Sequence, residues 1–304
     1  MLLLTSFFVD ILLPEQDDNQ STKFYNNFLS QYTSITVTAL VSQSVFLHDT
    51  YVDTSKEDLD KDIDNIINSI PDGAEYKRKI YKTLCMGSHI NPGKTLQEEE
   101  KRSFISDLFI QDSKKYNMSN REMIIKGLNT SAFLNYFFLL EDSLKNIYIE
   151  VNMISDDNFQ LKGSEVISKA LKHILEKKSI QNDFFLELKK RSKFFINYQS
   201  LNRTWKLLNF IRNRLIHDNG YYNEKAKNLF KIYYENILKI YTNESESLTI
   251  SLFIDKIDKY QQQIDENNYL IVDDVLENII RNFSVFIMES LYICTENQAV
   301  VETC

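Results

Sequence analysis

The segment from Arg212 to His217 holds side chains that can cleave RNA without a metal ion. Such cleavage needs a base for the 2′-hydroxyl group, a proton for the departing 5′-oxygen and fixed positive charge near the phosphorane. Histidine titrates close to neutral pH and can take either proton role. Arginine supplies a permanent charge and a bidentate contact to phosphate. The catalytic candidates are therefore Arg212, His217 and Asn213, which directly follows the arginine.

The sequence around these residues predicts the end of a long helix. An apolar face is supplied by Leu207, Leu208, Phe210, Ile211 and Leu215. Asp218-Asn219-Gly220 follows the histidine and favours the left-handed conformation that ends helices. We therefore expect a helical stretch over residues 184–217, with residues 198–202 as the place of any interruption.

The segment IRNRLIHDNG resembles the motif of the HEPN superfamily, in particular that of HEPN proteins in bacterial phage-defence and toxin–antitoxin loci. Members carry an arginine, usually a polar residue after it, and a histidine after four to six intervening residues, at the end of the third helix of a small bundle. The resemblance covers about residues 120–295, and helices at 131–151, 164–177 and 184–217 correspond to the first three of the family. It implies a ribonuclease that leaves a 2′,3′-cyclic phosphate.

The sequence departs from the family pattern at one position. Some family toxins place a tyrosine two residues after the histidine, whereas Asn219 stands here and Tyr221 and Tyr222 follow. The resemblance therefore assigns no role to these tyrosines.

Helical geometry separates the two main catalytic candidates. With about 100° of rotation per residue, Asn213 and His217 lie roughly 40° apart around the axis, whereas Arg212 and His217 lie about 140° apart. One regular helix cannot direct Arg212 and His217 at one phosphate. Either the helix distorts as it ends at Asp218, or two chains join their motifs across a two-fold axis, as the resemblance implies. We predict a homodimer with a shared cleft.

Basic residues gather around the motif in a chain that is acidic overall. The formal net charge is −8, which by itself disfavours a polyanionic partner. Residues 160–231, however, hold 16 Lys and Arg against 6 Asp and Glu, a local net charge of +10. Candidates for contacts to RNA phosphates are Lys189, Lys190, Arg191, Lys193, Arg203, Lys206 and Arg214. The alternative is a set of solvated helix faces.

A structural role for the motif is the main alternative to catalysis. Arg212 would then pair with Glu141 or Asp142 of the predicted 131–151 helix, and the helix dipole would favour His217 at its C-terminal end. In a catalytic site, the same two carboxylates would stand behind the arginine. The structural alternative leads to a non-catalytic helical module that binds RNA or a partner protein. A third alternative is an antitoxin-like or immunity protein.

The catalytic interpretation predicts a metal-independent RNA endonuclease of the toxin or abortive-infection kind. Its substrate would be tRNA or mRNA, and an inhibitory partner protein or RNA would restrain it. His48, His89 and His173 have no Asp, Glu or Cys partner at metal-ligand spacing, so we expect no metal site. The sequence has no Gly-rich phosphate loop, and we expect no cofactor.

Composition favours an all-α protein of the cytoplasm. With 6 Gly and 3 Pro in 304 residues, the chain lacks the turn residues that many short strands need. Three cysteines without C-x-x-C spacing fit a reducing compartment. Residues 1–13 are apolar but contain Asp10 and no basic region, so we interpret them as a buried strand or packing arm. No other apolar run approaches the roughly 18 residues of a membrane span, and we expect no membrane contact.

A capping-box pattern from Ser119 to Glu122 marks the start of a new set of helices. It divides the chain into a mostly helical N-terminal domain, residues 1–118, with a regulatory or sensing role, and a HEPN-like bundle, residues 119–304, that carries the motif. The helices expected before the boundary are 21–48, 55–69, one that ends near 85, and 96–111. Those expected after the motif are 224–241, 248–264 and 273–294.

Overall fold

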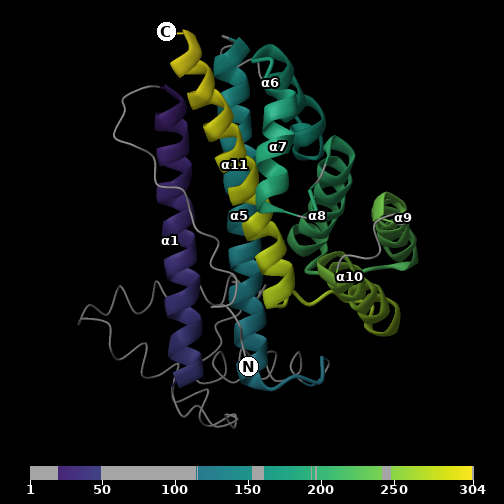
Figure 1. The fold of residues 1–304 in the computed structure, drawn as a ribbon. Helices are drawn as coiled ribbons and strands as arrows, with labels where there is room; N and C mark the ends of the chain where they lie inside the picture. The colour runs from purple at the N-terminus through teal and green to yellow at the C-terminus, as the bar shows by residue number, and fades with distance from the viewer. Residues whose placement is uncertain are drawn as a thin grey trace, which may run out of the picture. The chain divides into compact units, whose positions relative to one another are not determined.

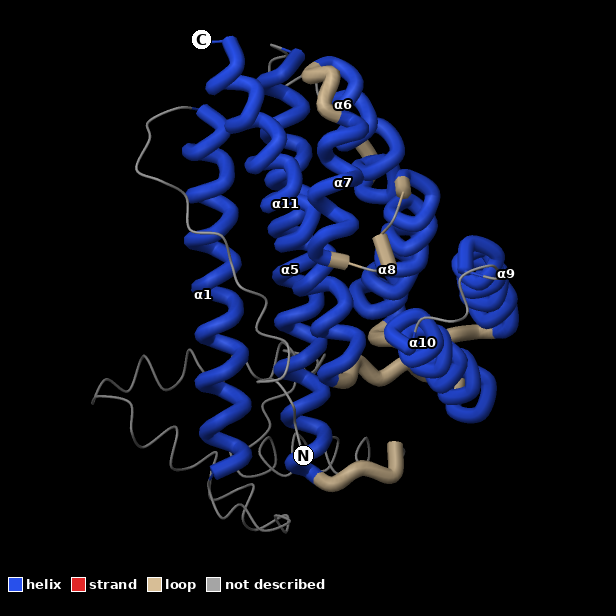
Figure 2. The backbone as a smooth tube through the Cα atoms, viewed as in Figure 1, coloured by secondary structure: helices blue, strands red, loops and turns tan. Residues whose placement is uncertain are grey.

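The computed structural model describes residues 20–48, 114, 116–152, 161–192, 194–195, 197–241 and 248–302. This part of the chain is 87% helical, with eight α-helices and no strand. Figures 1 and 2 show the course of these helices. The predicted all-α class is confirmed. The apolar residues 1–13 and the helices expected between residues 55 and 111 lie outside the described residues.

The chain divides into two compact units whose limits differ from the predicted boundary. Met1–Val41 and Leu128–Cys304 form one unit, and Ser42–Gly127 forms the other. Most of helix α1 (Gln20–His48) therefore belongs to the unit that carries the motif. The sequence had placed this helix in a separate N-terminal domain.

Aromatic side chains explain why α1 joins that unit. Tyr25, Phe28 and Tyr32 follow helical spacing and are buried. The ring of Tyr25 stacks on Tyr292 of α11 (Asp274–Glu302) with centroids 4.6 Å apart. The ring of Tyr32 lies 5.4 Å from that of Tyr136 in α5 (Asn120–Asn152). These contacts join residues far apart in the sequence, so local patterns did not predict them.

Helix α5 begins at the capping box that the sequence predicted. The backbone N–H of Ser119 donates to Glu122 Oε2 at 2.8 Å, and the backbone N–H of Glu122 donates to Ser119 Oγ at 3.2 Å. Both residues thereby satisfy backbone donors that the first turn of a helix leaves open.

The same helix is long and apolar enough to cross a membrane by length and composition, over Glu122–Asn152. The sequence had indicated no membrane span in this region. In the structure Phe133, Tyr136, Leu140 and Leu144 of this helix are fully buried among other helices. A core helix passes the same test of length and composition, so the match is weak evidence for a membrane span.

Residues 163–177 form the next helical stretch, close to the predicted limits of 164–177. It consists of a 3₁₀ turn η3 (Gly163–Glu165), a π-helical segment η4 (Val166–Leu171) and helix α6 (Lys172–Lys177). Four of the six π-helical residues are buried. The departure from regular α-helix therefore lies in the core of the bundle, where packing rather than local propensity decides geometry.

The helical stretch predicted over residues 184–217, with residues 198–202 as the place of any interruption, is two helices, α7 (Gln181–Arg191) and α8 (Tyr198–Asp218). The break precedes the predicted position. Ser192 is extended, and its Oγ accepts the backbone N–H groups of Phe194 and Phe195 at 3.1 and 3.3 Å. Asn197 then caps α8, because its Oδ1 accepts the backbone N–H of Ser200 at 2.9 Å.

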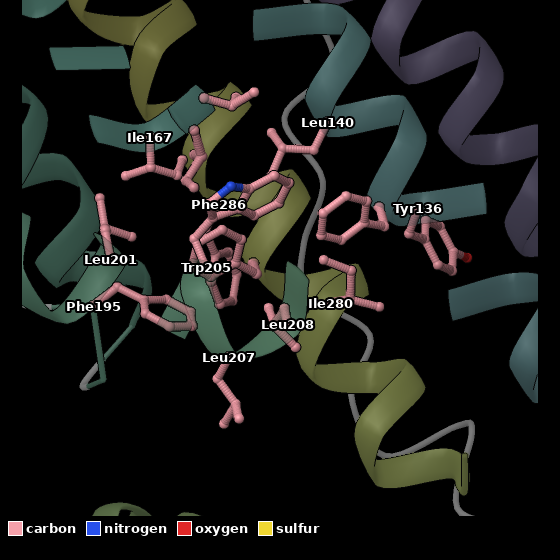
Figure 3. Close-up of a cluster of buried hydrophobic side chains, with 14 of the residues drawn as sticks. Tyr136, Leu140, Ile167, Phe195, Leu201, Trp205, Leu207, Leu208, Ile280 and Phe286 are labelled. Atoms are coloured by element: carbon pink, nitrogen blue, oxygen red, sulfur yellow. The ribbon is translucent and has the colours of Figure 1, made fainter. Parts of the chain in front are cut away.

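Trp205 fixes α8 in the core (Figure 3). Its ring is fully buried, and the ring centroid lies 4.3 Å from that of Phe137 of α5 and 6.0 Å from that of Phe283 of α11. Its Nε1 donates to the carbonyl oxygen of Gly163 at 2.7 Å. One side chain thus ties α8 to α5, α11 and η3, which sets the direction of every other residue on α8.

The C-terminal helices are α9 (Glu224–Tyr241), α10 (Leu248–Asn267) and α11. The prediction for α9 was correct, and α10 and α11 run beyond their predicted ends. Helix α11 carries buried charges: Arg281 lies 3.5 Å from Glu277, and Glu289 lies 3.1 Å from Arg191 of α7. Burial raises the pKa of Glu277 to about 7, against the opposing effect of the Arg281 charge.

Candidate active site at the end of helix α8

Helix α8 remains α-helical through the whole motif. It ends at Asp218, and Asn219 then takes the left-handed conformation, with φ 50° and ψ 38°, as the sequence predicted. Gly220 follows with φ 78°, and its N–H donates to the carbonyl oxygen of Arg214 at 2.9 Å. The helix therefore does not distort before Asp218 in a way that would turn Arg212 towards His217.

Arg212 lies on the side of α8 that faces α5. Its guanidinium carbon lies 4.8 Å from the ring centre of Phe138 and 5.5 Å from that of Phe137. Its Nη1 donates to Asn213 Oδ1 at 2.8 Å. The side chain is 21% exposed, and its Nε is buried without a hydrogen-bond partner among the described residues. Two rings and one amide thus hold the guanidinium in place.

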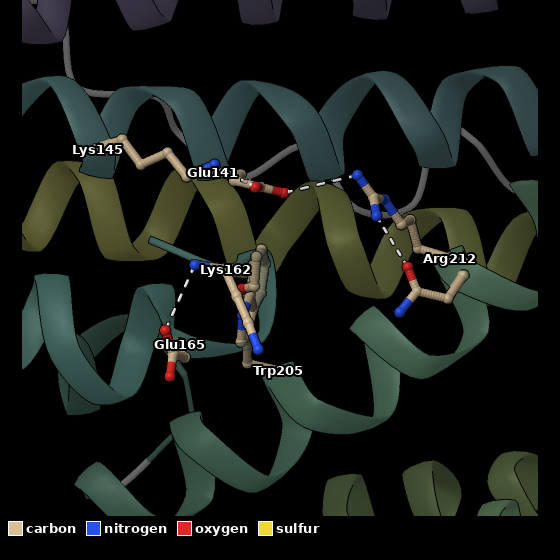
Figure 4. A network of polar contacts seen from close by, with 8 residues as sticks. Glu141, Lys145, Lys162, Glu165, Trp205 and Arg212 are labelled. Carbon is tan, nitrogen blue, oxygen red and sulfur yellow. Dashed lines mark hydrogen bonds and ion pairs between the residues drawn. The ribbon is translucent and has the colours of Figure 1, made fainter. Parts of the chain in front are cut away.

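Glu141 of α5 stands behind Arg212 (Figure 4). Its Oε2 lies 4.0 Å from Arg212 Nη2, and its Oε1 accepts Lys145 Nζ at 2.5 Å. A Cβ atom added to Gly163 would lie 3.0 Å from both carboxylate oxygens. This side of Glu141 therefore has no room for another atom. Both the catalytic and the structural interpretation of the motif predicted that Glu141 lies beside Arg212.

Asp142, the other predicted carboxylate, is exposed. A step of about 100° around α5 separates it from Glu141, and no ion pair joins it to Arg212 among the described residues. The structure therefore brings only one of the two predicted carboxylates to the arginine.

His217 lies on the exposed side of α8. Its neighbour Ile216 is 42% exposed, so the last turn of the helix presents both residues to the surface. With α8 helical to Asp218, Arg212 and His217 remain about 140° apart around the axis. One chain thus brings Arg212, Asn213 and Glu141 together and leaves His217 apart.

Three of the four lysines predicted to contact RNA are on the surface. Lys189 and Lys206 are exposed, and Lys190 is exposed while it pairs with Glu187 at 2.5 Å. Lys193 lies outside the described residues. The positive charge of Lys189, Lys190 and Lys206 is accessible to a large anion, because exposed ion pairs such as that of Lys190 are weak.

The predicted arginines make contacts within the protein instead. Arg191 pairs with the buried Glu289 at 3.1 Å, and Arg203 Nη1 donates to a backbone carbonyl of α9 at 2.5 Å. Arg214 pairs with Asp218 one turn later. These contacts tie helices together or neutralise a carboxylate, so the three arginines contribute less to a phosphate surface than the sequence suggested.

Some parts of the site gave no local signal in the sequence. Phe138 appeared only as one more apolar residue of a core helix. The close approach of Gly163 to Glu141 joins two segments, and only the fold reveals it. Tyr221 pairs with Tyr269 in an isolated antiparallel bridge, and Tyr269 has no motif near it in the sequence.

A cavity of about 260 Å³ lies elsewhere, among α1, α5, α11 and the end of α6, and its lining includes Phe24, Ile147, Lys178 and Met288. No residue of the motif lines it. The motif is therefore a surface site rather than part of this cavity.

Comparison of the chain with protein-family models, with curated proteins and with solved structures found no match.

Proposed function

We propose that this chain is a metal-independent RNA endonuclease of the toxin or abortive-infection kind, with a HEPN-like active site, that acts on tRNA or mRNA in the cytoplasm. The 2′-hydroxyl group attacks the adjacent phosphorus, the 5′-oxygen leaves, and a 2′,3′-cyclic phosphate remains. His217 transfers the proton, as base for the 2′-hydroxyl or as acid for the 5′-oxygen. Arg212 holds the phosphate and compensates the charge that develops on it.

The state of the Arg212 guanidinium is the observation that supports this proposal most. The group is fixed by Phe137, Phe138 and Asn213, yet Nη2 stays 4.0 Å from the nearest carboxylate oxygen. That distance is longer than a hydrogen bond. Lys145 shares the charge of the same carboxylate. Such an arginine is oriented in advance and keeps charge and donors for a phosphate.

The proposal requires two chains, because His217 lies on another side of α8. Between Arg212 and His217, the surface of the helix is formed by Ile216 and Asn213, about 40° and 100° from the arginine. Ile216 is 42% exposed. A two-fold contact over this face would bring Arg212 of one chain towards His217 of its partner. An inhibitory partner protein or RNA that covers the same face would restrain the enzyme.

A non-catalytic helical module that binds RNA or a protein is the second candidate. The packing of Arg212 over two phenylalanine rings and its pairing with Glu141 favour it. These contacts stabilise the bundle whether or not the arginine ever meets a phosphate.

Cleavage of RNA by the purified full chain distinguishes the two. We expect cleavage of a single-stranded RNA oligonucleotide in the presence of EDTA, with 2′,3′-cyclic phosphate ends detected by mass spectrometry. His217→Ala should lower the rate by about 100-fold or more, the usual contribution of proton transfer by one side chain. His173→Ala is the matched control, because His173 Nε2 bonds to Asn152 Oδ1 at 2.7 Å and lies outside the motif.

Circular dichroism verifies that both variants fold. If His217→Ala cleaves as fast as the wild type and as His173→Ala, the catalytic assignment is wrong. Intact RNA in all three reactions would favour the binding module.

A further inference from the structure

The segment after α8 is held by backbone contacts against the connection between α10 and α11. The backbone N–H of Tyr222 donates to the carbonyl oxygen of Asn268 at 2.8 Å, and that of Leu270 donates to Gly220 at 3.1 Å. These two bonds frame the antiparallel bridge between Tyr221 and Tyr269. The bridge places both tyrosines in fixed register at the point where the motif helix has just ended.

The two tyrosine rings form a small aromatic surface beside the motif. Their centroids lie 5.2 Å apart, with 61° between the ring planes. Tyr221 is 42% exposed, although the next residue, Tyr222, is fully buried. The backbone N–H of Tyr221 donates to the carbonyl oxygen of Asp218 at 2.9 Å, so the aromatic surface begins one turn beyond His217.

The carboxylate that directly follows His217 is paired with a cation. Asp218 is the acidic residue closest in sequence to His217, and it pairs with Arg214. Its negative charge is therefore compensated where a phosphate would approach His217. An exposed ring on a backbone held in register, four residues after a histidine and three after a paired carboxylate, fits a nucleotide better than it fits a purely apolar partner.

We propose that the Tyr221–Tyr269 pair is a stacking platform for an unpaired RNA base that neighbours the phosphate at His217. This inference rests on the proposed function and names its substrate class, single-stranded RNA. Stacking on an aromatic side chain tolerates every base, because each base has a π face. A base inside a duplex is not free to stack on protein, so the platform selects loops and unpaired ends.

Binding to an RNA that stays intact tests the platform without cleavage. The probe is a fluorescein-labelled single-stranded RNA of twelve nucleotides, and the starting protein is the full chain with His217→Ala. In that background, Tyr221→Ala should raise Kd about tenfold, within the range measured for loss of one base–aromatic stack. Tyr221→Phe, which keeps the ring, should stay within about twofold. Ile232→Ala is the matched control, since Ile232 is an exposed residue of α9, 51% exposed.

Two further measurements separate stacking from a structural role of Tyr221. An abasic RNA of the same length has the phosphates and no bases, so Tyr221→Ala should not change its Kd. Tyr221→Leu keeps bulk without a π face and should resemble Tyr221→Ala, which matters if the alanine variant folds poorly. Equal losses for abasic and normal RNA, or unchanged binding in both the alanine and leucine variants, would overturn the platform.

The platform and the proposed function can fail separately. If the wild type cleaves RNA through His217 and Tyr221→Ala changes neither Kd nor KM, the platform is wrong and the function stands. If Tyr221→Ala weakens binding of single-stranded RNA but the wild type cleaves none, the platform stands and the nuclease is wrong. Absence of RNA binding by every variant contradicts both.

Discussion

Glu141 and Asp142 are adjacent in the sequence and differ in what their side chains can do. Glu141 is 5% exposed and contacts Lys145 and Arg212, whereas Asp142 is exposed. The orientation of α5 in the bundle determines which of the two carboxylates faces Arg212, because successive residues are rotated by about 100° around the helix axis. We expect a change of charge at this buried carboxylate to shift Lys145 and Arg212, the two cations beside it.

We predict that Glu141→Gln lowers kcat/KM for RNA cleavage roughly 10- to 100-fold, the usual cost of a small displacement of a catalytic group. The neutral amide keeps the shape of the side chain but no longer attracts the guanidinium of Arg212. Asp142→Asn, the matched control, should cleave at the wild-type rate. Cleavage rates and thermal melting of the three proteins test this.

A lower melting temperature for Glu141→Gln without loss of rate would assign Glu141 to the fold alone. Equal loss of rate in both variants would show that overall acidity, rather than the contact with Arg212, matters.

At the residue scale, the sequence predicted which side chains stand at the motif but not their partners. The helix stop at Asn219 and the cap at Ser119 depend on neighbours in the sequence, and both predictions were confirmed. Arg191 was expected on an RNA surface, yet it pairs with Glu289, which lies far along the chain on α11. A pattern of basic residues cannot show which of them the fold will pair with buried carboxylates.

At the scale of helices, prediction succeeded where the chain itself marks an end and failed where the end depends on packing. The limits of α9 were predicted correctly. The break between α7 and α8 was placed too late, because the Phe194-Phe195 pair continues an apolar helical pattern although the backbone has already turned at Ser192. The π-helical segment η4 has no signal in the sequence, since its four buried residues are those of any core helix.

Two glycines in different elements should respond in opposite ways to the same substitution. Gly220 follows the left-handed cap of the motif helix with φ 78°, and an added Cβ would lie 3.2 Å from the carbonyl oxygen of Leu270. Gly220→Ala should therefore lower the free energy of unfolding by about 1 to 2 kcal/mol, the cost of a left-handed conformation for an L-residue. Gly127 lies inside α5 with nothing within 4 Å of an added Cβ, so Gly127→Ala should be neutral or stabilise by up to about 1 kcal/mol.

Urea unfolding of the wild type and both variants, monitored by circular dichroism, measures the change in the free energy of unfolding that each substitution causes. A Gly220→Ala protein as stable as the wild type would mean that the turn after α8 can move away from Leu270, and the platform built on the bridge would lose its rigidity.

On the scale of the whole molecule, the chain is acidic, so binding of RNA requires that its positive charge be concentrated in one region. The net charge is −8, and the excess of Lys and Arg falls in residues 160–231. The structure leaves Lys189 and Lys206 exposed within that stretch. A second copy of the chain would double this local charge around a shared cleft, which strengthens the attraction of a polyanion. The sequence suggested such a dimer from the angle between Arg212 and His217 and from the family resemblance of the motif.

Mixing two inactive variants tests whether a site is shared between chains. Arg212→Ala and His217→Ala are each expected to be inactive. In a mixed dimer, the intact arginine of one chain faces the intact histidine of its partner, so one of the two sites is complete. After equal mixing and free exchange, half of the dimers are mixed, and cleavage should return to about one quarter of the wild-type rate. Sedimentation confirms that dimers are present, and each variant incubated alone is the control. If sites lie within single chains, no mixture regains activity, and the shared cleft between two copies of α8 is wrong.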